Sequence, residues 1–459
     1  MKDRFDPLFY SGWLLGFFKK LKFKTVKLKD LTLYLKNGFA AGHNDQSFNE
    51  NDIIQIRPTN INSDNMLVFD KNIYISRKTL NLKKSDVLIK NEILFNNTNS
   101  QELVGKTSFF DFDSINFCSN HITRIMCGNK ILPKYLWIIL NFYQKNKIFF
   151  NLCTNWNNQS GVNINVLANL LIPLPEKNTQ EKIISIFEKS IINKQSKESK
   201  AQKMLDGIDD YLLSELGIKL PKEKPNILKN RIFKTSVKNI SGGRFDPIYN
   251  DIYYLKFEES IKQSKYKLKK IFELCYGKSG VVYSVNDEAK DGKGILRANN
   301  IDLSTNELNL SDIKFISNNI FISSDLLLKK NDILMCSASG SKEHVGKVAY
   351  ICEDLNLYFG GFMMVLRGKT SMLLSKYLFE FLRSLFFRKY LFRQLGGTNI
   401  NNLNFHMISN LFIPLPPIDV QNKIAEAIKK IREEAKRLRF EASSELENAK
   451  KEIERMLLK

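Results

Sequence analysis

"NLLIPLPEKNTQEKI" (Asn169–Ile183) returns as "NLFIPLPPIDVQNKI" (Asn410–Ile424), 241 positions later (410 − 169). Two prolines at alternate positions cannot enter a helix interior, and each imposes extended backbone on the residue before it. Each phrase therefore predicts an extended segment that ends where a helix begins. Six residues are predicted to form this structural joint, the two glutamines by capping backbone groups or by contacting the other copy: Pro173, Pro175, Gln180, Pro414, Pro416 and Gln421.

Five further phrases recur in the same order at nearly the same spacing. Six collinear matches with one or two net insertions predict a tandem duplication in which both copies have the same fold. The pairs are "RFDPLF" at Arg4 and "RFDPIY" at Arg244, "VKLKDL" at Val26 and "YKLKKI" at Tyr266, "IQIRPTNI" at Ile54 and "GILRANNI" at Gly294, "KNEILFNNTNSQELVGK" at Lys90 and "KNDILMCSASGSKEHVGK" at Lys330, and "PKYLWIIL" at Pro133 and "SKYLFEFL" at Ser375.

Each copy begins with a pattern typical of mixed β structure. Short apolar runs bounded by Asn, Ser, Asp and Gly predict strands, namely "DIIQI", "NIYIS", "DVLI" and "EILF" in the first copy. A helix is predicted from Pro133, with a counterpart that starts near Ser375. The stretch "YLFEFLRSLFFRKYLFRQL" (Tyr377–Leu395) predicts a half-buried amphipathic helix, because Arg and Lys recur along it.

A long helix is predicted after each proline-rich phrase. From Ile424 to Lys459 there is no Gly or Pro, and apolar residues recur at alternating steps of four and three, as in a coiled coil. The first helix should end at Gly217, before Pro221. We expect the two helices to pair antiparallel; the alternative is that each packs only on its own domain. The predicted fold is α+β, with two tandem domains separated by a two-helix spacer and an internal pseudo-two-fold duplication: domain 1 at 1–175, helix at 176–220, linker and domain 2 at 221–416, helix at 417–459.

The composition favours a polyanionic partner. Lys and Arg number 70 against 48 acidic residues, a formal charge of +22. This excess points to nucleic acid before membrane, although a solvated basic surface is the alternative. The six cysteines show no C-x-x-C spacing, which predicts reduced thiols in a cytoplasmic protein and no zinc site. No apolar run is long enough to span a bilayer.

Three motifs of enzymes that act on DNA are missing from the sequence. It contains no N-P-P-[YF] or D-P-P-[YF] tetrapeptide, no G-x-x-x-x-G-K-[ST] phosphate loop and no convincing acidic cluster for a nuclease metal. We therefore expect a chain without catalytic residues, cofactor or metal of its own.

The duplicated plan resembles the specificity subunits of type I restriction-modification systems. The phrases "LIPLPEKNTQEKI", "LFIPLPPIDVQNKI", "GGTNINNLN" and "IDDYLLSELGI" carry the resemblance, which covers nearly the whole chain. It implies two target recognition domains that each recognise half of a split double-stranded DNA site. It also implies helices that fix the spacing and dock two methyltransferase subunits. S-adenosylmethionine would bind those subunits, and ATP with Mg²⁺ the motor-nuclease subunits.

Three alternatives to this assignment remain open from the sequence. The chain could serve another multi-subunit methyltransferase or restriction system, be an enzyme with its own methyltransferase or nuclease activity, or be a structural coiled-coil protein. One departure concerns the loops before the proline-rich phrases. The second copy has a glycine pair, Gly396–Gly397, where the first has Asn155–Trp156, so the two loops should differ in shape.

Residues that contact DNA should be donors and acceptors on loops and strand ends, with further cations on phosphates. Matched polar positions in the two copies are the best candidates. For each Asn the alternative is turn formation, and for Arg57 and Arg297 it is an internal salt bridge. Lys36, Lys278 and Lys342 are predicted phosphate contacts. The full set is Lys36, Arg57, Asn60, Asn97, Thr98, Asn99, Asn157, Gln159, Ser160, Lys278, Arg297, Asn300, Ser339, Ser341, Lys342, Thr398, Asn399 and Asn401.

Overall fold

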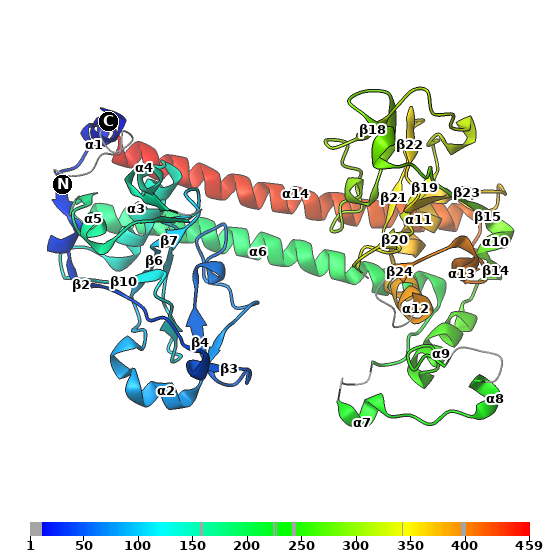
Figure 1. Ribbon diagram of the computed structural model, residues 1–459, viewed down its shortest axis with the longest axis horizontal. Helices are drawn as coiled ribbons and strands as arrows, with labels where there is room; N and C mark the ends of the chain where they lie inside the picture. Colours follow the sequence, from blue (N-terminus) through cyan, green and yellow to red (C-terminus); the bar gives the residue numbers. More distant parts are fainter. Residues whose placement is uncertain are drawn as a thin grey trace. The chain divides into compact units, whose positions relative to one another are not determined.

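The structure, a computed structural model, describes residues 12–156, 159–223, 225, 227–240, 245–341, 343–395 and 401–459. The chain divides into two compact units, which have nearly the same order of elements (Figure 1). Unit 1 comprises residues 1–198 and 439–459, and unit 2 comprises residues 199–438. Within the described ranges no helix is both long and apolar enough to cross a bilayer. The duplicated α+β fold predicted from the repeated phrases is confirmed.

A four-stranded antiparallel sheet lies at the centre of each unit. Its order is β2-β10-β6-β8 in unit 1 and β15-β23-β19-β21 in unit 2. The inner strands β6 and β19 are buried at every position, so the sheet is covered on both faces. The strands are β2 (Thr32–Asn37), β6 (Ile93–Asn96), β8 (Thr107–Phe109), β10 (Ile122–Cys127), β15 (Cys275–Ser279), β19 (Ile333–Cys336), β21 (Val348–Tyr350) and β23 (Met363–Gly368).

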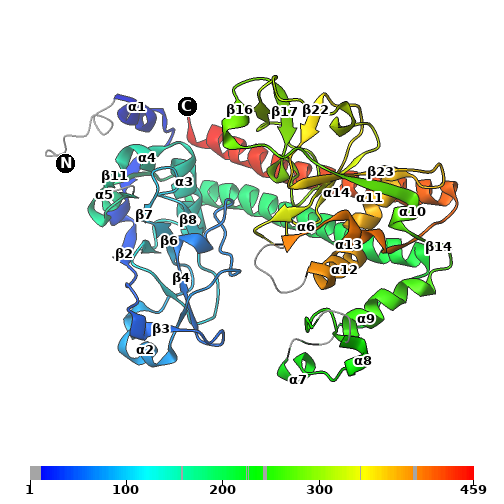
Figure 2. The ribbon, with the colours of Figure 1, turned by 45° about the vertical axis from the view of Figure 1, so that its right-hand side comes forward.

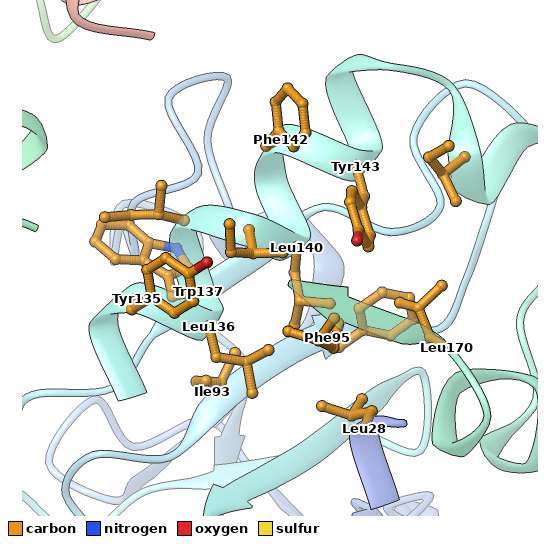
Figure 3. Close-up of a cluster of buried hydrophobic side chains, with 14 of the residues drawn as sticks. Leu28, Ile93, Phe95, Tyr135, Leu136, Trp137, Leu140, Phe142, Tyr143 and Leu170 are labelled. Atoms are coloured by element: carbon orange, nitrogen blue, oxygen red, sulfur yellow. The ribbon is translucent and has the colours of Figure 1, made fainter. Parts of the chain in front are cut away.

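Helices cover one face of each central sheet. In unit 1, α3 (Pro133–Lys145) buries Leu136 and Leu140 against Phe95 of the sheet (Figure 3). The start of α3 at Pro133 and the start of α11 (Ser375–Arg383) confirm the predictions. The prediction of a single helix over Tyr377–Leu395 is wrong. The hydroxyl of Ser384 accepts a hydrogen bond from the Phe387 amide at 3.3 Å and so starts a second helix, α12 (Leu385–Leu395).

A smaller sheet forms a second lobe in each unit. Its order is β3-β5-β4-β9 in unit 1 and β16-β18-β17-β22 in unit 2, with β4–β9 and β17–β22 parallel. In both views of unit 1, β3 and α2 (Arg77–Leu82) lie at the end opposite to α3 and α4 (Ile148–Leu152) (Figures 1 and 2). The strands are β3 (Gln46–Ser47), β4 (Ile53–Ile56), β5 (Tyr74–Ile75), β9 (Phe117–Cys118), β16 (Glu288–Ala289), β17 (Lys293–Leu296), β18 (Lys314–Ile316) and β22 (Leu357–Phe359).

The predicted strand at "DVLI" (Asp86–Ile89) is wrong, because this segment is irregular. The guanidinium of Arg124 donates hydrogen bonds to the carbonyls of Ser85 and Val87, at 3.3 and 2.6 Å. Within the segment, the Val87 carbonyl is therefore bonded to a side chain, and the Ile89 carbonyl to the nearby Glu92 amide, rather than to a neighbouring strand.

The two long helices are α6 (Lys177–Leu216) and α14 (Ile418–Leu457), each of 40 residues. By residue range, α6 begins in unit 1 and ends in unit 2, and α14 does the reverse. In unit 2, Ala201 packs against Ala435 and Leu438, which fixes an antiparallel pairing there together with the ion pair Glu215–Lys423. In unit 1 the helices are joined by Lys197, whose ammonium lies 3.1 Å from Glu441.

Eight of the ten predicted seam residues of α14 are buried, whereas Ile431 and Met456 are half-buried. Ile424 and Ile428 also join the core of unit 2, and Leu446 and Ile453 join that of unit 1, so the helices pair with each other and pack on the units as well. Gly217 ends α6 with φ +74°, while the Ile218 amide donates to the Leu213 carbonyl, as the predicted glycine cap requires. The buried seam residues are Ile424, Ile428, Ala435, Leu438, Ala442, Leu446, Ala449 and Ile453.

The remaining elements are short and mostly recur in both units. Paired strands at the joints are β1 (Thr25–Lys27) with β13 (Leu171–Pro173), and β14 (Leu268–Lys270) with β25 (Phe412–Pro414). Loop strands are β7 (Thr98–Asn99), β11 (Thr154–Trp156), β12 (Gln159–Gly161), β20 (Ala338–Ser339) and β24 (Asn401–Asn402). The other helices are α1 (Gly12–Lys20), α2 (Arg77–Leu82), α4 (Ile148–Leu152), α5 (Ile164–Ala168), α7 (Leu228–Arg231), α8 (Val237–Ile240), α9 (Ile252–Glu259), α10 (Ile271–Leu274) and α13 (Phe405–Ser409).

Candidate nucleic-acid interface

An identical turn follows β4 and β17 and presents an arginine in each unit. The side-chain oxygen of Asn60 accepts a hydrogen bond from the Arg57 amide at 2.9 Å, and Asn300 does the same for Arg297 at 2.8 Å. Both asparagines are 1% exposed, and both also donate to backbone carbonyls inside their loops. This placement favours the alternative of turn formation for Asn60 and Asn300, so the half-buried Arg57 and Arg297 remain the candidate contacts of the turn.

The environments of the two arginines differ. Arg57 donates to the Gln55 side chain at 3.4 Å, a long and weak contact. Arg297 instead forms an ion pair with Asp312 at 3.1 Å. The internal salt bridge considered for these residues is thus observed in unit 2. The Nε atoms of both arginines are buried and have no hydrogen-bond partner within the structure, so neither guanidinium is saturated by the protein.

A groove in unit 1 brings four of the predicted residues together. Its volume is about 540 Å³, and Arg57, Thr98, Asn99 and Gln159 line it. The pairing of β7 with β12 sets this arrangement, because Asn99 lies opposite Ser160 in the ladder. The described lining residues hold two cations and no carboxylate, a combination that suits a polyanion. Six lining residues were not predicted: Pro58, Thr59, Lys71, Ile73, Ser100 and His121.

Two predicted residues of unit 1 are buried beneath the groove and form hydrogen bonds within the protein. The side-chain NH₂ group of buried Asn97 lies within hydrogen-bond distance of the Asn37 side-chain oxygen, the Asn120 carbonyl and the Thr123 hydroxyl, at 3.2, 3.1 and 3.0 Å. The hydroxyl of buried Ser160 donates to Asn155 at 2.6 Å. These bonds direct Asn97 and Ser160 inward, so they shape the loop strands rather than offering groups to a ligand. Asn157 lies outside the described residues.

The corresponding loops of unit 2 are described in part. Strand β20 pairs with β24, so Ser339 lies opposite Asn401 in the ladder. Ser341 is exposed, and its amide donates to the Ser339 hydroxyl at 3.2 Å. The backbone of Asn401 belongs to β24, whereas three further predicted residues lie outside the described ranges: Lys342, Thr398 and Asn399.

The two predicted phosphate contacts that are described occupy matching strand positions and are already engaged. Lys36 donates to the Ser85 carbonyl at 2.6 Å. Lys278 forms an ion pair with Asp325, and this hydrogen bond lowers the pKa of the Asp325 carboxyl. Each lysine therefore joins the central sheet to the segment that precedes β6 or β19. Contact with a phosphate would require these side chains to exchange partners.

Sequence reasoning missed a buried ion pair that recurs in both units. Arg124 and Glu92 are fully buried and lie 2.7 Å apart, and Arg367 lies 2.8 Å from Asp332. Each guanidinium also donates to two carbonyls of the segment before the inner strand. The sequence did offer one sign of this pair, because "KNEILF" and "KNDILM" both carry an acidic residue, Glu92 or Asp332, at the same position. The two arginines lie on β10 and β23. When the two sheets are aligned by their strand pairing, Arg367 lies two residues beyond the position that corresponds to Arg124, so the sequence repeat does not align the two arginines.

The joint residues make three matching hydrogen bonds in each unit, and Gln421 makes one more, to the Met372 carbonyl. The carboxamide oxygen of Gln180 accepts from the Leu132 amide at 2.9 Å, and that of Gln421 accepts from the Leu374 amide at 2.8 Å. Their NH₂ groups donate to the carbonyls of Pro175 and Pro416. Tyr135 and Tyr377 donate to the carbonyls of two further joint residues, Pro173 and Pro414. Both glutamines are buried.

A family model described as "Type I restriction modification DNA specificity domain" matches residues 20–204 and 261–448, well over half of the chain. The chain belongs to this family. Two separate matches in one type I specificity chain agree with the duplication seen in the fold.

Individual members of the type I specificity family resemble parts or most of the chain. The EcoKI specificity subunit of Escherichia coli K12 is 30% identical over 153 residues, which is 32% of this chain and 32% of that protein. The match thus spans about a third of that relative. The MjaVIII specificity subunit of Methanocaldococcus jannaschii is 24% identical over 404 residues, 85% of this chain and 82% of that protein.

The fold of this type I specificity chain also resembles a solved structure. One solved structure comes from work on the complex assembly and conformational transition of the type I R-M system. It aligns with this chain with a TM-score of 0.55 at 14% sequence identity. The alignment covers 95% of this chain and 97% of that chain. The likeness at this identity is one of fold.

Proposed function

We propose that this type I specificity subunit recognises a bipartite double-stranded DNA site, each unit contacting one half. The observation that carries the proposal is the duplicated turn, which places Arg57 of unit 1 beside loop strands rich in donors and offers Arg297 at the matching position of unit 2. Arginine is the side chain that most often contacts guanine edges, and it also pairs with phosphates. The formal charge of +22 supports a DNA partner.

The two long helices would fix the distance between the half-sites. A 40-residue helix is about 60 Å long at 1.5 Å per residue, and its length does not vary as a loop's would. We further propose that the exposed faces of α6 and α14 dock two methyltransferase subunits and that motor-nuclease subunits join the complex. Residues that differ between the two units would then give the two half-sites different sequences, while the helices set their separation.

The chain would supply recognition and no chemistry. S-adenosylmethionine would be bound by the methyltransferase subunits, and ATP with Mg²⁺ by the motor-nuclease subunits, all in the cytoplasm. The test is to co-express the chain with its methyltransferase partners and to measure binding to duplex DNA over a range of salt concentrations. Affinity should fall steeply with salt, and one bipartite sequence should be preferred. Absence of any sequence preference would refute the proposal.

A parallel test concerns catalysis. The purified chain alone, mixed with DNA and radiolabelled S-adenosylmethionine, should transfer no methyl group, whereas the reconstituted complex should methylate DNA. Methyl transfer by the chain alone would show that it is itself an enzyme.

A further inference from the structure

His121 and Phe362 occupy equivalent positions in the two units, where their side chains differ in chemistry. His121 stands between β9 and β10, and its carbonyl accepts from the Asn97 amide at 3.0 Å. Phe362 stands between β22 and β23, and its carbonyl accepts from the Ser337 amide at 2.9 Å. The strand pairing agrees with this match. Ile122, which follows His121, pairs with Asn96 at the end of β6, and Met363, which follows Phe362, pairs with Cys336 at the end of β19.

His121 belongs to the groove that holds the candidate DNA contacts of unit 1. It lines this groove together with Arg57, Thr98 and Gln159. Phe362 adjoins the loop strand β20 of unit 2, because its carbonyl also accepts a hydrogen bond from the Ala338 amide at 3.2 Å. A position that adjoins the contact loops in both units is placed to touch the same partner in both.

The ring of Phe362 is exposed although its backbone is held firmly. The side chain is 73% exposed, and its neighbour Val282 is 89% exposed. Val282 lies beside Gly361, the residue before Phe362, because a Cβ atom added to Gly361 would come within 3.1 Å of Val282. Adjacent backbone bonds, from the Val281 amide to the Phe359 carbonyl at 2.8 Å among them, restrain both segments. A large exposed aromatic ring on a restrained backbone is available for contact with a partner.

We propose that His121 and Phe362 are specificity-determining residues, each for the half-site that its own unit contacts. This inference rests on the proposed function. Phe362 has no hydrogen-bonding group, so it selects a base by apolar contact, and the apolar feature of base pairs in the major groove is the thymine methyl group. His121 can donate and accept hydrogen bonds and therefore selects a base edge. The half-site of unit 2 should accordingly contain a thymine at the position that Phe362 contacts.

The experiment compares the wild-type complex with a complex that carries Phe362→Ala, both assembled with the methyltransferase subunits. Burial of a phenylalanine ring is worth about 1.5–3 kcal/mol, so affinity for the preferred site should fall about ten- to hundredfold. The salt dependence should not change, because no charge is lost. Phe321→Ala is the matched control: Phe321 is 92% exposed, follows β18 in the smaller sheet, and should leave affinity unchanged.

A change in the DNA tests the same contact without altering the protein. Replacing the thymines of the half-site by deoxyuridine removes only their methyl groups. One such replacement should weaken the wild-type complex and have no effect on the Phe362→Ala complex. An equal effect on both complexes, unchanged affinity of Phe362→Ala, or a half-site without any A·T pair would each overturn the inference.

The outcomes also separate this inference from the function on which it rests. A wild-type complex without sequence preference refutes the proposed function. A wild-type complex with a bipartite preference that Phe362→Ala shares in full refutes only the role of Phe362. The exchange His121→Phe should change the preferred base in the half-site of unit 1 and leave the other half-site as it was; a change in both halves contradicts the assignment.

Discussion

Substitution of Gln421 by alanine tests the view that the repeated proline-rich phrase is a structural joint. The buried carboxamide of Gln421 makes three hydrogen bonds, to the Leu374 amide and to the carbonyls of Met372 and Pro416, each of 2.8 Å. Gln180 makes two, to the Leu132 amide and the Pro175 carbonyl. A buried polar group left without a partner costs about 1–3 kcal/mol. Gln421→Ala should therefore destabilise unit 2 by about 2–5 kcal/mol, and Gln180→Ala should destabilise unit 1 by less.

Hydrogen exchange followed by mass spectrometry is the suitable assay. The Leu374 amide, which precedes α11, should exchange faster in Gln421→Ala, and the Leu132 amide should be unaffected. Gln421→Met serves as the control for volume, because it fills the site without forming the bonds. If Gln421→Met is as unstable as Gln421→Ala, the loss comes from the hydrogen bonds. Wild-type exchange at Leu374 in Gln421→Ala would refute the reasoning.

Three further outcomes follow from the packing. Glu92→Ala should destabilise unit 1 by about 3–5 kcal/mol, because it leaves Arg124 buried without its counter-ion; the double change to apolar residues should cost less in urea unfolding. Gly346→Ala should lower the melting temperature, since Gly346 has φ +80° and a Cβ would lie 2.1 Å from Leu391; normal melting would contradict this. Iodoacetamide at pH 8 should label Cys352 first, because the other five thiols are buried and burial raises the pKa of three of them to about 12, so that they stay neutral; rapid labelling of a second thiol would contradict this.

The architecture was predictable because the chain repeats itself. Any interpretation of one copy could be checked against the other, and prolines such as Pro173 and Pro414 restrict the backbone whatever surrounds them. The apolar steps of α14 predicted its buried seam for a similar reason, since helix geometry alone decides which residues share a face. These features depend on local chemistry, which a sequence displays directly.

The candidate site was less predictable, because it depends on which way side chains point. An asparagine in a loop looks the same whether it is bonded inward, as Asn60 and Asn97 are, or faces a groove, as Asn99 does. The Arg124–Glu92 pair depends on the register between strands that are far apart in the chain. His121 was not among the predicted contacts, because its counterpart Phe362 has a different side chain and the prediction relied on polar residues that match in the two copies.

The most direct test of the central claim replaces residues 1–175 by the corresponding segment of another type I specificity subunit. The hybrid is expressed with the methyltransferase subunits, and the methylated sequences of the host genome are determined. The proposed function predicts that one half of the bipartite methylated site changes while the other half and their spacing are kept. Methylated sites that change in both halves, or in neither, would contradict it.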